Sequence, residues 1–150
     1  MDSVPFPQAD DFEKIVTIVN ISDSNALNDS VKLSQTLGGI TDRQVAYYLS
    51  AATFLGLIES EKGQKKFTPK CLEIRNMNSY LQTAELISLI LQNPVFSKVY
   101  SYTIVIGIQE VEDIKEVIKE YYPQYSDAIY ERRAQTVSSW INWIIEKTQG

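Results

Sequence analysis

The sequence contains no histidine and a single cysteine, Cys71. One cysteine cannot form an internal disulfide, and without histidine or a CxxC pair a zinc cluster built from soft ligands is excluded. The missing imidazole also excludes Ser-His-Asp and Cys-His catalysis. We therefore expect no metal site, no cofactor and no catalytic residues, so that the protein is not an enzyme. Cys71 is expected to fill a small space in the core.

Long hydrophobic runs are also missing. No stretch approaches the ~20 consecutive apolar residues of a membrane-spanning helix, and residues 1–11 lack the basic region and apolar run of a signal peptide. We expect a cytoplasmic protein without a membrane partner. Its 150 residues, 44% hydrophobic and 22% charged, are typical of one globular domain or two small ones.

Charge is unevenly distributed along the chain, although the net value is only −5. Residues 1–31 carry six acids and one lysine, residues 32–80 carry seven bases and four acids, and residues 81–150 carry six bases and nine acids. Only the middle third is basic. A polyanionic partner is therefore expected to bind in this part of the chain.

Three helices are predicted in the first part of the chain. Asp10 or Asp11 caps the first, and a short second helix ends at Gly38-Gly39. Thr41 followed by Gln44 is typical of a capping box, so a third helix begins there and runs to about Leu55. The apolar positions predicted to face inward are Phe12, Ile15, Val16, Val19, Val31, Leu33, Leu37, Val45, Tyr48, Leu49, Ala52 and Leu55.

A β-hairpin is predicted directly after the third helix, with strands over 57–60 and 65–68, a turn over 61–64 and Pro69 as the stop. Three helices followed by a hairpin, joined by FLGLIESEKGQKKFTP, resemble the winged-helix domain. The resemblance implies that the third helix reads DNA and that the hairpin is the wing. The expected fold class is mostly α with a small β-hairpin, a winged helix-turn-helix. The alternative is a plain three-helix domain with a β-ribbon at its edge.

A second helical unit is predicted over residues 79–150. Helices are expected over 81–91 and 110–121, with a final one from Ser126 to about Lys147, whereas residues 95–108 could form a helix or a strand. The last helix has arginines and a glutamine near its start, like the third helix, so the two halves are expected to be tandem variants of one unit, the second without a wing. The expected division is a tail over 1–10, a winged-helix domain over 11–75 and the second unit over 79–150.

Two segments carry a further resemblance. NPVFSKVYSY and ERRAQTVSSWINWI are similar to parts of tandem winged-helix modules in bacterial restriction-modification proteins. The resemblance implies a DNA-binding role in a restriction-modification or transcription-regulatory system.

Two surfaces are candidates for binding double-stranded DNA, because arginine and glutamine can read bases in the major groove and lysines can reach phosphates. The first consists of Arg43, Gln44, Tyr47, Ser50, Lys62, Lys65 and Lys66. The second consists of Arg132, Arg133, Gln135, Thr136 and Ser139 on the solvent side of the last helix. The alternative interpretation is ordinary solvated residues on capped helices and a lysine-protected edge strand.

Three further patterns of the sequence concern one short motif, the tryptophans and the tyrosines. Asp113-Ile114-Lys115 matches half of a metal-dependent nuclease motif, but no Pro-Asp pair accompanies it, so a solvated helix face is expected instead. Trp140 and Trp143 are expected at the core and its edge. Nine tyrosines are too many to be buried together, which favours the rival function, a protein-interaction or oligomerisation module built on a winged-helix scaffold.

Overall fold

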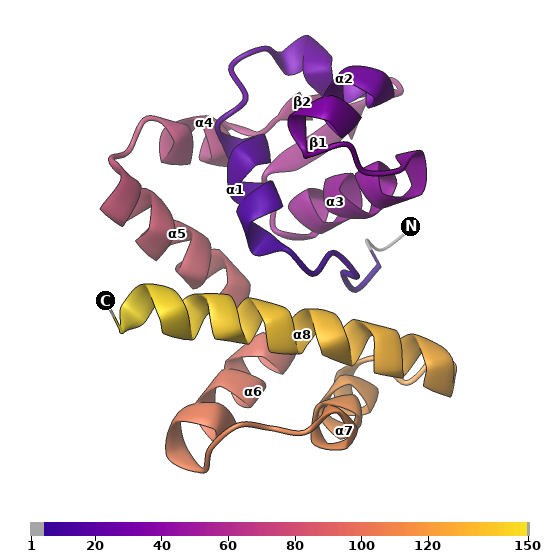
Figure 1. Cartoon of the computed structure of the whole chain (residues 1–150), viewed down its shortest axis with the longest axis vertical. Helices are drawn as coiled ribbons and strands as arrows, with labels where there is room; N and C mark the ends of the chain where they lie inside the picture. Colours follow the sequence, from indigo (N-terminus) through magenta and orange to yellow (C-terminus); the bar gives the residue numbers. More distant parts are fainter. Residues whose placement is uncertain (1–4, 150) are drawn as a thin grey trace. The chain divides into compact units, whose positions relative to one another are not determined.

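The computed structural model describes residues 5–149 and separates the chain into two compact units, Met1–Gln82 and Thr83–Gly150 (Figure 1). The described residues are mostly helical and include one two-stranded antiparallel sheet, which lies in the first unit. The predicted class, mostly α with a small β-hairpin, is therefore confirmed at this level.

The first unit places its helices before and after the hairpin. Its elements are α1 (Phe12–Val19), the 3-10 helix η1 (Ser24–Asn28), α2 (Ser30–Thr36), α3 (Asp42–Phe54), β1 (Ile58–Glu61), β2 (Gln64–Phe67) and α4 (Pro69–Arg75). Short polar side chains fix the helix starts: Asp11 accepts a hydrogen bond from the Glu13 amide at 3.1 Å. Such caps satisfy amides that have no partner inside the helix.

The capping box predicted at the start of α3 is confirmed. Thr41 Oγ1 accepts from the Gln44 amide at 3.2 Å, and Gln44 Oε1 accepts from the Thr41 amide at 3.0 Å. At the other end Gly56, with φ of 77°, turns the chain out of the helix. α3 is thereby held at both ends by its own sequence.

The hairpin has the tight turn that a short loop requires. Lys62 and Gly63 both adopt left-handed φ values, 53° and 78°, as in the two-residue turns that match the twist of paired strands. This turn places Glu59 opposite Lys66 and Ile58 opposite Phe67. The outer edge of β2 is met by the Asn28 side chain, which donates to the Lys65 carbonyl and accepts from the Lys65 amide, both at 2.9 Å.

The core of the first unit follows most of the predicted pattern, with two differences. Val31 is 65% exposed, because it lies two positions before the buried Leu33 and therefore on the opposite side of α2. Ile18, rather than Val16, completes the buried face of α1. Phe6 in the predicted tail is also buried, and its ring meets Phe54 edge-on at 5.7 Å. Residues 5–10 therefore add to the core although they form no helix or strand.

Helix α4 follows the hairpin and was not predicted. Thr68 caps it by accepting from the Cys71 amide at 3.2 Å, and Pro69 occupies the first helical turn, where its missing N–H costs nothing. Cys71 is fully buried, as expected. Burial raises the pKa of its thiol to about 11, despite the opposing effect of Arg75.

The division between the units falls inside α5 (Ser79–Leu91). The second unit then contains α6 (Pro94–Val105), α7 (Val111–Tyr121) and α8 (Asp127–Thr148), and α8 packs against both α6 and α7. The ambiguous segment is thus helical up to Val105, with Asn93 as its cap and Pro94 in the first turn. Trp140 and Trp143 are buried, as predicted. No helix within the described range is both long and apolar enough to cross a bilayer.

Candidate nucleic-acid interface

The exposed side of α3 carries a stripe of three predicted residues. Arg43, Tyr47 and Ser50 follow the spacing of neighbours on one helix face, and Arg43 is exposed while the other two are half-buried. Arg43 Nε donates to Tyr47 Oη at 2.6 Å, and the guanidinium carbon lies 5.5 Å from the ring centroid. The arginine is therefore held along the helix, with its charge at the surface.

Gln44, the fourth predicted residue of α3, is engaged in the structure of the helix. Its Oε1 accepts from both the amide and, at 3.4 Å, the hydroxyl of Thr41. Reading an adenine takes the oxygen and the nitrogen of the amide together. In the capped helix Gln44 is thus placed as a cap and not as a bidentate base reader.

The three hairpin lysines lie in different environments. Lys62 is exposed in the turn, and Lys65 is half-buried with its backbone bonded to Asn28. Lys66 forms ion pairs with Glu61 and, at 3.4 Å, with Glu59. The hydrogen bonds that Lys66 donates to these carboxylates raise its pKa, first that to Glu61 and then that to Glu59. The positive charge of Lys66 is therefore balanced within the hairpin.

The residues of the second predicted surface do not lie together on one exposed face of α8. Arg133 and Thr136, predicted on its solvent side, are buried; Gln135 is exposed, and Arg132 and Ser139 are half-buried. Arg133 is buried because its guanidinium stacks on an aromatic face: the guanidinium carbon lies 4.2 Å from the Tyr125 ring centroid. Arg132 Nη1 donates to Thr136 Oγ1 at 3.4 Å.

Lys115 was also placed incorrectly by the sequence pattern. It was expected on a solvated face with Asp113, but it is buried and pairs with Asp127 at 2.8 Å and Glu112 at 3.3 Å. Asp113 instead accepts from the Glu110 amide at 3.4 Å at the start of α7. Lys115 therefore joins α7 to the start of α8. Within residues 5–149, no three Cys, Asp or Glu side chains come together as a metal site.

Two features of the hairpin were missed by the sequence analysis. The pairing of Lys66 with Glu59 could have been found, since a two-residue turn at Lys62-Gly63 fixes which residues face each other. The contact of Asn28 with β2 has no comparable signal. It joins positions 37 residues apart through a side chain, and no local pattern reports such a contact.

The fold and surfaces define a mostly helical protein of two units, the first with a hairpin beside an exposed arginine-bearing helix face. Residues 14–149 match the family described as a domain of unknown function, DUF7226, and the chain belongs to this family. No curated protein and no solved structure matches it.

Proposed function

We propose that the first unit is a winged helix that binds double-stranded DNA and that the chain itself catalyses no reaction. The order of elements supports this proposal, since α1, α2 and α3 precede the hairpin β1–β2. In this interpretation α3 is the reading helix and the hairpin is the wing. We propose that the second unit is a variant of the first that lacks the wing.

The observation that carries the proposal is the stripe of Arg43, Tyr47 and Ser50 on α3, in the only basic third of the chain. The first turns of a reading helix are the part that approaches base edges. An arginine can pair with both acceptors of guanine, while hydroxyl groups bond to bases or phosphates. Arg43 is thus proposed as the base reader, with Tyr47 and Ser50 beside it.

The hairpin supplies the proposed phosphate contacts, through Lys62 and Lys65. Two hydrogen bonds between the Asn28 side chain and the Lys65 backbone hold β2 against η1, so these lysines extend from a hairpin that is fixed to the rest of the unit. A contact made from a rigid element loses less conformational entropy on binding. Lys66 is left out of the proposed contact set because Glu59 and Glu61 balance its charge.

The test is the replacement of Arg43 by alanine. We expect binding to a duplex selected from a random library to weaken by about 1 to 3 kcal/mol, with relaxed discrimination at one base pair and a much smaller loss on random DNA. Electrophoretic mobility shift at low and physiological salt measures both. The free energy of unfolding should change by no more than about 0.5 kcal/mol, since the Arg43 side chain is exposed.

The matched control is Lys147→Gln, which removes one positive charge from the end of α8. It should leave discrimination between sequences unchanged. Equal affinity of Arg43→Ala and the wild type for the selected duplex would exclude α3 as the reader.

The hairpin is tested by the dependence of binding on salt. Removing the charge of one lysine that contacts a phosphate reduces the slope of log K against log salt by about one. The double variant Lys62→Gln, Lys65→Gln is therefore expected to reduce this slope by about two on every DNA sequence. Lys66→Gln is the matched control within the same hairpin and should change the slope far less. If Lys66→Gln had the larger effect, the assignment of roles within the hairpin would be wrong.

We propose the biological system in which the protein acts from its sequence resemblance to other proteins. Similarity to tandem winged-helix modules points to a bacterial restriction-modification or transcription-regulatory system and to the cytoplasm. The rival function, a protein-interaction or oligomerisation module, is favoured by a separate observation in the second unit, the exposed apolar residues after α6.

A further inference from the structure

The end of α6 and the loop after it expose four large apolar side chains within five residues. Ile104, Val105, Ile106 and Ile108 are 60, 83, 75 and 85% exposed. Together they define the α6-end patch. Only Gly107 interrupts them, and its φ of 127° turns the chain out of the helix. Single exposed apolar residues are ordinary, but a contiguous group of this kind marks a surface that another molecule covers.

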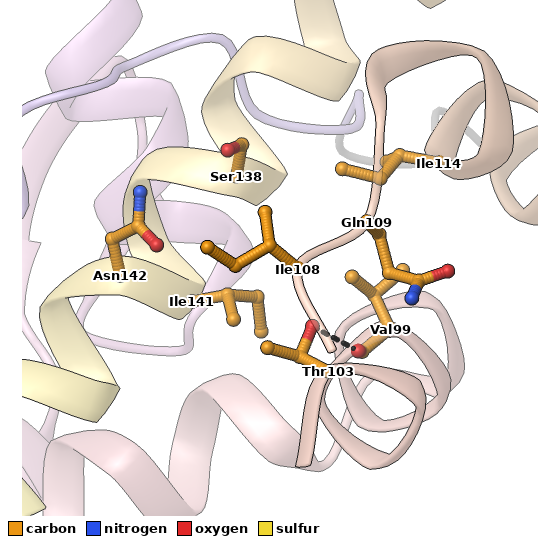
Figure 2. Close-up of a pocket in the computed structure, with 8 residues that line it drawn as sticks. All are labelled: Val99, Thr103, Ile108, Gln109, Ile114, Ser138, Ile141 and Asn142. Atoms are coloured by element: carbon orange, nitrogen blue, oxygen red, sulfur yellow. Dashed lines mark hydrogen bonds between the residues drawn. The ribbon is translucent and has the colours of Figure 1, made fainter. Parts of the chain in front are cut away.

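The patch continues into a hollow of the second unit (Figure 2). Ile108 lies beside Ile141, with Val99 and Ile114 as further apolar walls, and the polar residues at this hollow are Thr103, Gln109, Ser138 and Asn142. The hollow itself has a volume of about 10 Å³, room for on the order of one water molecule. Its occupant is therefore not a small-molecule ligand, and what covers the patch must rest on its surface.

The lack of charge in the α6-end patch, and the acids beside it, indicate what kind of partner it binds. Residues 99–109 contain no charged side chain, which makes this surface unsuited to DNA and leaves no like charges within the patch itself to repel an identical patch. Directly after it come three exposed acids, Glu110, Glu112 and Asp113. These carboxylates disfavour docking on an anionic membrane, which attracts basic segments.

The area agrees with a second copy of the chain. A valine or isoleucine has a full accessible surface of roughly 150 to 200 Å², so the four residues expose about 500 Å² in one copy. Two copies that covered these patches completely would remove about 1,000 Å² from water, which is the lower limit of a specific interface. We infer that the α6-end patch is a twofold interface through which two copies of the chain associate, each covering the other's patch.

This inference goes beyond DNA binding and does not depend on it. It predicts a reversible dimer with a dissociation constant on the order of 10⁻⁵ M, because the buried area is small. Sedimentation velocity of the full chain without DNA, over a concentration range spanning this value, should show a shift from monomer to dimer. Val105→Glu combined with Ile108→Glu should weaken the dimer at least tenfold, since each pair of patches would bring four carboxylates together.

The matched control is Val31→Glu, which adds the same charge at a valine that is 65% exposed in the first unit. It should associate as the wild type does, and circular dichroism should show that all variants retain their helices. A wild type that stays monomeric throughout the range, a double variant that dimerises like the wild type, or assemblies that grow beyond dimers would each overturn the twofold interface. So would monomers that bind phosphatidylcholine–phosphatidylserine vesicles through these residues, an outcome that would assign the patch to a membrane.

Discussion

Replacing Trp140 by alanine is expected to destabilise the second unit by about 3 to 5 kcal/mol. The indole is fully buried and stacks on Phe96, with ring centroids 5.0 Å apart and planes 20° from parallel. Removing it leaves a large cavity between α8 and α6 that the surrounding helices cannot fill. A loss of this size is a large fraction of the stability of a small domain.

Urea unfolding followed by circular dichroism at 222 nm measures this change. The matched control is Tyr80→Ala, which truncates an aromatic residue that is almost wholly exposed and should change stability by no more than about 0.5 kcal/mol. If the two variants unfolded at the same urea concentration, Trp140 would not be a core residue.

The second large effect is expected at Leu55, where alanine should cost the first unit about 2 to 5 kcal/mol. Leu55 is buried at the C-terminal end of α3, just before Gly56 turns the chain toward β1. Its loss removes apolar contact at the point where the helix gives way to the hairpin. The same urea measurement applies, with Val31→Ala as the exposed aliphatic control. Unfolding within error of the wild type would mean that Leu55 contributes little to the core.

Helix starts were the most predictable part of this fold, because each depends on a few neighbouring residues. Thr41 and Ser126 act as N-caps at the predicted helix starts, and Asp11 is the cap of the two candidates, Asp10 and Asp11, that the sequence left open. The hairpin was equally predictable, because its turn depends on two neighbouring residues, Lys62 and Gly63, which adopt the left-handed conformation. A signal of the same kind is present at Thr68-Pro69, where Thr68 caps α4 and Pro69 lies in its first turn, although only the end of a strand was predicted there.

Burial of polar side chains was the least predictable part, because it depends on contacts distant from each helix. Periodicity placed Arg133 and Thr136 outside, but α8 packs against two helices and its buried face is wider than one apolar stripe. Lys115 is buried because Asp127, on another helix, pairs with it. For the candidate interface, the sequence located α3 and the hairpin. It also predicted the capping box that engages Gln44, but it did not show that Lys66 already has partners within the hairpin.

The buried thiol in α4 has a consequence for how the protein can be handled and observed. Because burial raises the pKa of Cys71 to about 11, very little of this thiol is ionised at pH 7, and its sulfur is enclosed by the core. Alkylating and oxidising reagents therefore reach it only when the first unit opens. The rate at which a thiol reagent modifies Cys71 therefore measures how often the first unit opens, without any residue having to be introduced as a probe.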